Sequence, residues 1–152
     1  MLFFIFVTIF AIMASVLLHL VGSQRLVALW DQNALLRRWR IAVLVIVFII
    51  IHMIEIGFFT VGISVLLQDG GYGYLEGLGT HDVGGLIYYS AITYTTVGYG
   101  DITPVGDLRL FAAIEALTGM VLVGWTASAI FTVMHRIWKD QQAELMGQRV
   151  EG

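Results

Sequence analysis

One stretch in the second half of the sequence could coordinate a cation through its backbone rather than through its side chains. It reads Thr96-Val97-Gly98-Tyr99-Gly100, so two glycines alternate with larger residues. Glycine adopts backbone conformations of either hand without a Cβ penalty, which makes a strand of alternating handedness accessible. In such a strand the carbonyl oxygens face one side, where they can replace the water shell of a cation. The side chains of Val97 and Tyr99 can pack away from those oxygens.

Several titratable side chains fall within or beside apolar stretches, where an unpaired charge is costly. His52 and Glu55 are three residues apart, so they share one face of a helix. Two roles remain open for them: a structural pair buried against the N-terminal apolar stretch, or a proton sensor. His135 is a second candidate for proton sensing, because histidine titrates near pH 6.5. We expect Glu115 to be structural, either protonated or accepting hydrogen bonds from hydroxyls such as that of Thr93.

The composition is that of a helical membrane protein. Of the 152 residues, 59% are hydrophobic and 12% are charged, whereas a soluble domain has about 25% charged residues. Three stretches have the roughly 20 apolar residues that a bilayer span requires, namely 1–21, 41–67 and 108–134. The first lacks the basic start and the cleavage site of a signal peptide, so we expect a retained helix. The absence of cysteine excludes disulfides and thiolate chemistry.

The basic residues predict the orientation of the chain in the cell membrane. The linker 22–40 holds four arginines, the tail 135–152 holds three further basic residues, and the loop 68–82 has neither Lys nor Arg. Because basic loops stay cytoplasmic, we expect a multi-pass protein with its N-terminus outside and its short tail in the cytoplasm. Tryptophans and leucines among the linker arginines favour an interfacial helix on the inner leaflet. A loosely ordered basic linker is the alternative.

The segment between the second and third spans predicts a re-entrant hairpin. Residues 68–82 are rich in glycine and are typical of an irregular extracellular loop. Asp82 is a candidate N-cap for a short apolar helix over 83–95, which at about 20 Å is too short to span the bilayer. The Thr96–Gly100 strand follows at once. Irregular backbone at membrane depth is tolerated only where it is buried in protein or lines a water-filled path.

The tract Thr95-Thr96-Val97-Gly98-Tyr99-Gly100-Asp101 resembles the potassium-channel signature letter for letter. The resemblance covers about residues 41–134 and is to small prokaryotic channels with two transmembrane helices around a pore loop. Here an extra helix precedes them. The resemblance implies an all-α membrane protein with three transmembrane helices per subunit, a re-entrant pore helix and a selectivity filter at 96–100. Each chain supplies one strand of the filter, so the pore would be a homotetramer.

The resemblance also implies the function, which is passive and potassium-selective conduction without enzymatic activity. The filter residues would be Thr96, Val97, Gly98, Tyr99 and Gly100, with K⁺ held by the carbonyls of the first four and by the Thr96 hydroxyl at the inner end. An intact Tyr99 favours potassium over sodium, and Thr95 and Asp101 would support the filter. Permeant K⁺ is the one cofactor expected. The expected partners are further copies of the chain and membrane lipid, with no nucleic acid and no small-molecule substrate.

The pore helix departs from that family at two places. Many potassium channels have tryptophans where this chain has Tyr88 and Tyr89. Some bacterial members have a glutamate behind the filter that bonds the motif aspartate, and here that position is Ile92. The outer support of the filter must therefore differ, and Tyr88 is a candidate donor to Asp101.

The third span would line the cavity and contain the gate. Gly119 and Gly124 lie inside it, where glycine costs about 1 kcal/mol relative to alanine. Gly119 matches the hinge glycine of the family, and close helix packing is the alternative, while for Gly124 we favour packing. The candidates to face the cavity are Met120, Val123, Ala127 and Phe131. The gate would lie lower, from Phe131 to His135.

Other function classes are weaker. An intramembrane metalloenzyme could use His19, His52, Glu55 and Glu115, but di-metal sites in helical proteins use repeated carboxylate and Glu-x-x-His units. This chain has a single His-x-x-Glu, and we place His19 near the inner surface. A non-conducting regulatory subunit and a weakly selective cation channel also remain as alternatives. No apolar helix has arginine at every third position, so no voltage sensor is visible.

Overall fold

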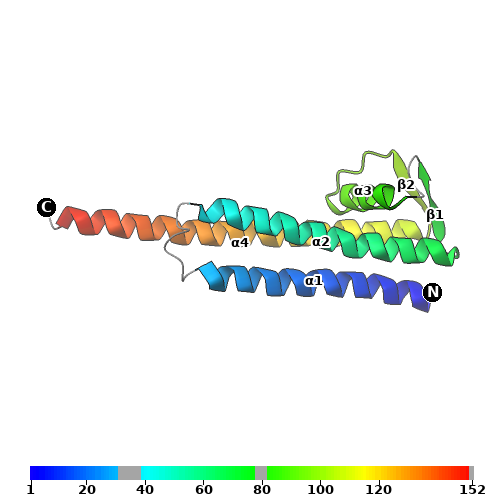
Figure 1. The fold of residues 1–152 in the computed structure, drawn as a ribbon, viewed down its shortest axis with the longest axis horizontal. Coiled ribbons are helices and arrows are strands. Elements are labelled where there is room, and N and C mark those ends of the chain that lie inside the picture. The colour runs from blue at the N-terminus through cyan, green and yellow to red at the C-terminus, as the bar shows by residue number, and fades with distance from the viewer. Residues whose placement is uncertain (31–38, 78–81, 151–152) are drawn as a thin grey trace.

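The computed structural model describes residues 1–30, 39–77 and 82–150 of the chain (Figure 1). Helices dominate it, and a small antiparallel sheet lies at one end beside the N-terminus, with the C-terminus at the other end. In chain order the elements of the described residues are α1 (Leu2–Trp30), α2 (Arg40–Asp69), β1 (Gly73–Gly77), α3 (Val83–Tyr94), β2 (Ile102–Gly106) and α4 (Leu108–Val150).

Three of the helices are long and apolar enough to cross a membrane. The spans are Leu2–Leu26 in α1, Ile41–Asp69 in α2 and Leu108–Lys139 in α4. The all-α membrane architecture expected from the sequence is therefore confirmed. Both α1 and α4 are longer than expected, since α1 continues to Trp30 rather than ending at residue 21, and α4 continues to Val150 rather than ending at residue 134.

The extension of α1 occupies the first part of the linker 22–40, for which an interfacial helix was one expectation. Gly22 lies at the start of this extension, and a Cβ there would be 2.8 Å from the Cδ1 atom of Ile51 on α2. The helix is therefore in close contact with α2 at the point where it passes the expected end. The rest of the linker, residues 31–38, lies outside the described residues.

The N-terminal helix packs on both α2 and α4 of its own chain. Phe4, Val7 and Ala11 are buried in one core cluster with residues of α2, α3 and α4. The rings of Phe4 and Phe111 meet edge to face, with centroids 6.5 Å apart. Gly62 of α2 leaves room for the ring of Phe111, because a Cβ there would lie 2.8 Å from the Cζ atom of Phe111. The sequence alone left the packing of this helix undecided.

The short helix α3 begins where the sequence indicated. The carboxylate of Asp82 accepts a hydrogen bond from the Gly85 backbone N–H at 2.9 Å, which caps the helix. The helix ends at Tyr94, so its length is about 18 Å. It packs against α2 and α4, and Tyr89 and Tyr94 are buried between them.

A two-stranded sheet replaces part of the irregular loop expected over residues 68–82. Strand β1 pairs antiparallel with β2, which follows the Thr96–Gly100 strand, in the register Gly73 to Gly106 and Gly77 to Ile102. Gly73 has a φ of +122°, and a Cβ there would lie 1.9 Å from the Val105 carbonyl oxygen. The pairing joins segments on either side of α3, so no local pattern in residues 68–82 predicts it.

Candidate functional site

The backbone of the Thr96–Gly100 strand alternates in handedness. The φ angles are +60° at Thr96, +50° at Gly98 and +81° at Gly100, while Val97 and Tyr99 are not among the residues with positive φ. Thr96 is the single residue other than glycine with a positive φ among those described. A bulky β-branched residue in this region is unusual, and such strain is concentrated at functional sites.

Hydrogen bonds from α3 position the start of the strand. The Thr96 N–H donates to the Thr93 carbonyl at 3.0 Å, and the Gly98 N–H donates to the Ile92 carbonyl at 3.0 Å. The Thr95 hydroxyl donates to the Ala91 carbonyl at 2.7 Å. These bonds fold the chain back on the end of α3, so the strand leaves the helix as a tight re-entrant turn.

The side chains of the strand are uncovered in the single chain. Val97 is 51% exposed and Tyr99 is 73% exposed. Two residues after the strand, Ile102 is buried in the main core and begins β2. The chain therefore presents the strand on its surface, between an anchored start and an anchored end.

Tyr88 and Asp101 form the contact that the sequence suggested. The Tyr88 hydroxyl donates to the Oδ2 atom of Asp101 at 2.8 Å, which ties the C-terminal end of the strand to α3. The carboxylate of Asp101 raises the pKa of the Tyr88 phenol, because it accepts a hydrogen bond from the neutral phenol and would repel a phenolate. Ile92 is buried and can make no such bond.

Gly119 packs directly on the end of α3. A Cβ at this position would lie 2.1 Å from the Tyr94 carbonyl oxygen and 2.9 Å from the Cγ atom of Tyr94. Close packing, the alternative to a hinge, is thus a feature of Gly119. The packing favoured for Gly124 is not found, since nothing among the described residues lies within 4 Å of a Cβ there.

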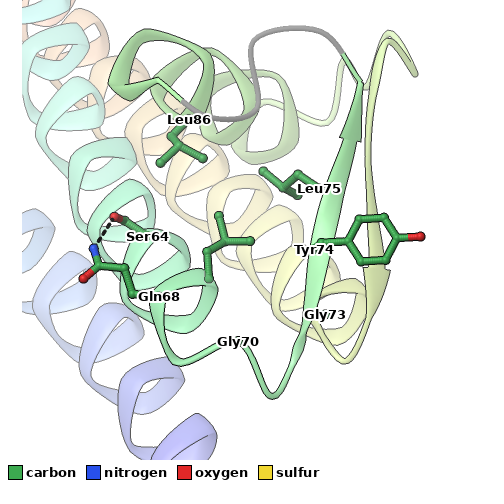
Figure 2. Close-up of a pocket in the computed structure, with 8 residues that line it drawn as sticks. Ser64, Gln68, Gly70, Gly73, Tyr74, Leu75 and Leu86 are labelled. Atoms are coloured by element: carbon green, nitrogen blue, oxygen red, sulfur yellow. Dashed lines mark hydrogen bonds between the residues drawn. The ribbon is translucent and has the colours of Figure 1, made fainter.

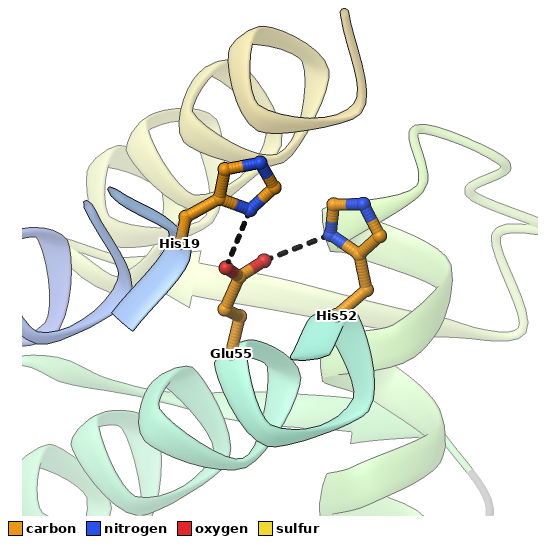
Figure 3. A group of neighbouring side chains, drawn as sticks. All are labelled: His19, His52 and Glu55. Atoms are coloured by element: carbon orange, nitrogen blue, oxygen red, sulfur yellow. Dashed lines mark hydrogen bonds and ion pairs between the residues drawn. The ribbon is translucent and has the colours of Figure 1, made fainter. Parts of the chain in front are cut away.

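A second group of polar side chains surrounds Glu55 (Figure 3). His19 Nδ1 lies 2.9 Å from Glu55 Oε1, and His52 Nδ1 lies 2.8 Å from Glu55 Oε2. The Tyr94 hydroxyl donates to Glu55 Oε2 at 2.5 Å, and Thr126 Oγ1 lies 2.9 Å from His52 Nε2. We call these five residues the Glu55 cluster. It joins α1, α2, α3 and α4.

The placement of His19 corrects an expectation. His19 does not lie near the inner surface but beside Glu55, which is midway along α2, and its side chain is fully buried. The packing of α1 on α2 decides this depth, and the sequence contains no signal for it. Tyr94 and Thr126 were also missed, because a tyrosine and a threonine in apolar helices resemble ordinary core residues.

The cluster offers three atoms that could hold a metal ion. One ring nitrogen each from His19 and His52 and one oxygen of Glu55 lie within 4.8 Å of one another. Glu115, the fourth residue of the metalloenzyme alternative, has no hydrogen-bond partner among the described residues. The donor expected from Thr93 is therefore absent, and Ser90 and Tyr89 nearby on α3 also have hydroxyls without a partner in that part of the chain.

The candidates for the cavity and gate lie along one helix. Met120, Val123 and Phe131 are 58%, 46% and 64% exposed on α4, and Ala127 is also exposed. His135 stacks on Phe131 with ring centroids 6.2 Å apart. His135 is thus separate from the Glu55 cluster.

A pocket of about 500 Å³ lies away from these groups, between the C-terminal end of α2, β1 and α3 (Figure 2). Leu75 and Leu86 face one another across it, and Gln68 donates to the Ser64 hydroxyl at 3.4 Å on its α2 side. The residues that line it carry no charged group and no histidine. It therefore offers neither an acid–base pair nor a metal ligand set.

Comparisons with known proteins agree with this arrangement. Two curated proteins named LctB, from Bacillus caldotenax and Geobacillus stearothermophilus, are 47% and 50% identical to the chain over 36 residues. The match covers 24% of this chain and 27% of each relative, so the chain spans about a quarter of the length of these relatives. No solved structure gives a significant match. A family model described as ion channel matches residues 45–136, which include α3, the Thr96–Gly100 strand and most of α2 and α4. The chain belongs to this ion channel family and is a multi-pass membrane protein.

Proposed function

We propose that the chain is one subunit of a homotetrameric, potassium-selective channel whose filter is the Thr96–Gly100 strand. The observation that carries the proposal is the positive φ at Thr96, Gly98 and Gly100, in alternation along an exposed strand. This alternation is what lets successive carbonyls face one axis and replace the hydration shell of an ion. The ligands are then the carbonyls of Thr96, Val97, Gly98 and Tyr99, with the Thr96 hydroxyl at the inner end.

Assembly follows from the number of oxygens that one strand provides. One strand contributes a single carbonyl at each level, so a ring of carbonyls requires four chains around the axis. The exposure of Val97 and Tyr99 supports this step, because a side chain that is 51% or 73% exposed at membrane depth needs a partner surface. The exposed side of α4, with Met120, Val123, Ala127 and Phe131, then faces the cavity or a neighbouring subunit.

The electrostatics of the subunit favour cations on both sides of the filter. The C-terminal end of α3 at Tyr94 carries a partial negative charge that points toward the inner side of the strand. Exposed acids surround the sheet and the outer end of the strand: Asp69, Glu76, Asp82, Asp101 and Asp107. Repeated in four subunits, they raise the local cation concentration at the mouth. In this orientation the sheet lies outside the cell and the C-terminus lies in the cytoplasm.

A flux assay with a matched pair of variants tests the role of the strand. Gly98→Ala places a Cβ on a residue with a φ of +50°, so we expect loss of potassium flux from liposomes that contain the purified protein. Gly124→Ala is the control, because nothing within 4 Å of its Cβ opposes the substitution, and it should retain flux. Normal flux in Gly98→Ala, with Gly124→Ala unchanged, would argue against the strand as the ion path.

Two other functions within the channel class predict different ion fluxes in this assay. A weakly selective cation channel would pass sodium and potassium at similar rates in the same liposomes. A non-conducting regulatory subunit would pass neither ion alone. Oligomeric mass distinguishes assembly from conduction, since a homotetramer has the mass of about four 16.9 kDa chains after correction for detergent. A monomer or dimer in detergent and in lipid would contradict the tetramer.

A further inference from the structure

We propose that His19, His52 and Glu55 form a binding site for a divalent transition-metal ion of the Zn²⁺ class, which fastens the N-terminal helix to the pore-forming helices. The site is separate from the Thr96–Gly100 strand. It stands whether or not the channel selects potassium.

The ligand types and spacing fit such an ion. Two imidazole nitrogens and one carboxylate oxygen form one of the ligand sets of four-coordinate zinc sites that keep an open position. Two ligands at about 2.0 Å from one tetrahedral ion are about 3.3 Å apart. His19 Nδ1 lies 2.9 Å from Oε1 and His52 Nδ1 lies 2.8 Å from Oε2 of the Glu55 carboxylate. One ligand atom from each residue lies within 4.8 Å of the other two, so the side chains must rearrange around the ion to reach the tetrahedral spacing.

The outer ring nitrogens support the same assignment. His52 Nε2 lies 2.9 Å and His19 Nε2 lies 3.4 Å from a single atom, Thr126 Oγ1. Ligating histidines commonly donate their second N–H to such a neighbour, which fixes the tautomer and the ring orientation. With both Nδ1 atoms on a metal, both Nε2–H groups can donate to Thr126, whose oxygen has two lone pairs.

Counting protons shows that the cluster lacks one positive charge without an ion. If both Nδ1–H groups donate to Glu55, both Nε2 atoms become acceptors that face Thr126. The single hydroxyl proton of Thr126 can satisfy just one of them. Neutral histidines beside the Glu55 carboxylate also leave a net negative charge at 0% side-chain exposure, which is costly in a membrane. A bound divalent cation lets both Nε2 atoms carry protons and offsets the carboxylate, which leaves one net positive charge at the site in place of one negative charge.

The surroundings provide a candidate for the fourth ligand position. The Tyr94 hydroxyl lies 3.0 Å from His52 Nδ1 and 2.5 Å from Glu55 Oε2, so an oxygen is already next to two of the three ligands. His52 is the member with some exposure, with 16% of its side chain accessible. Because Tyr94 precedes Thr95 and Thr96, an ion here would also stiffen the base of the strand.

Metal binding to the purified full-length protein tests the proposal. The protein is stripped with a chelator and titrated with ZnCl₂ by calorimetry, and bound zinc is measured by mass spectrometry. We expect about one tight Zn²⁺ per chain. His19→Gln and Glu55→Gln should lose this saturable binding, and His135→Gln, which removes a histidine of the same helix bundle outside the cluster, should keep it.

Two further measurements keep the result clear if a ligand variant folds poorly. Thr126→Val retains all three ligands and should weaken zinc binding by about 10- to 100-fold through the lost outer-ring contact. Co²⁺ should give the visible absorption of a four-coordinate nitrogen and oxygen site, and His52→Gln should abolish it. Absence of saturable zinc binding in the wild type, which is the outcome if an extra proton serves the cluster instead, overturns the proposal. Equal binding by wild type and Glu55→Gln overturns it too.

Discussion

A Cβ atom on Gly119 of α4 would lie 2.1 Å from the backbone carbonyl oxygen of Tyr94, the last residue of α3. The helix that would line the cavity therefore touches the residue from which the Thr96–Gly100 strand departs. Tyr94 also donates to Glu55, so one residue connects the strand, α4 and the Glu55 cluster. Movement of α4 at Gly119 would therefore shift Tyr94 and the start of the Thr96–Gly100 strand.

Alanine at Gly119 should destabilise the subunit. No real Cβ fits at 2.1 Å from backbone, so α3 and α4 must separate, at a cost of about 1–3 kcal/mol in the free energy of unfolding. Thermal unfolding of the protein in detergent measures the effect. Gly124→Ala is the matched control in the same helix, where the gain in helix propensity is up to about 1 kcal/mol and nothing opposes it. If the two variants unfold alike, the contact between Gly119 and Tyr94 is not tight.

Phenylalanine at Tyr88 should loosen the outer end of the strand. The substitution removes the 2.8 Å hydrogen bond to Asp101 and keeps the ring. We expect channel currents that decline faster during sustained opening, because the strand is then held mainly from its inner side. Tyr74→Phe is a suitable control, since Tyr74 is an exposed tyrosine on β1. Currents that hold equally long in Tyr88→Phe and in the wild type would argue against this supporting role.

The same bond should persist in alkaline solution. The Asp101 carboxylate raises the pKa of Tyr88, so the neutral phenol is favoured in the folded chain. The stabilisation is then complete below the ordinary tyrosine pKa of about 10 and is lost as the pH rises through the raised value. Tyrosinate absorbance of wild type minus Tyr88→Phe isolates this residue. A midpoint at or below the ordinary value would contradict the bond.

Alanine at Gly73 should break the pairing of β1 with β2. Its Cβ would lie 1.9 Å from the Val105 carbonyl oxygen, and its φ of +122° is unfavourable for any side chain. Amide hydrogen exchange should quicken across β2, which is the element that follows the strand. Gly71→Ala is the control, because its nearest neighbour is a flexible carboxylate oxygen of Asp69 at 3.4 Å. Unchanged protection at Thr103 and Val105 would show that the sheet does not depend on Gly73.

The sequence was most informative where a function depends on local backbone chemistry. Gly98 and Gly100 predicted the strand of alternating handedness, and Asp82 predicted the start of α3. The lengths of the apolar stretches predicted the three membrane spans. Contacts between elements that are distant in the sequence could not be predicted in this way. The depth of His19 depends on how α1 packs, and the partner of β1 lies beyond the strand. The sequence of α4 also cannot show that the Tyr94 backbone passes within contact distance of Gly119, whose role as a hinge stays a prediction.

Orientation and gating stay predictions of the sequence. The arginines of the linker 22–40 favour a cytoplasmic location, but residues 31–38 are outside the described residues. His52 and Glu55, first considered as a pair, are now part of a buried cluster with His19, Tyr94 and Thr126. His135 lies on α4 against Phe131 and stays a separate candidate for proton sensing.

The most direct test of the central claim is the reversal potential of the wild-type protein in a planar bilayer, with potassium on one side and sodium on the other. If the carbonyls of Thr96, Val97, Gly98 and Tyr99 replace the hydration shell of potassium, the current should reverse far from zero, on the side set by potassium. A reversal potential near zero would contradict potassium selectivity.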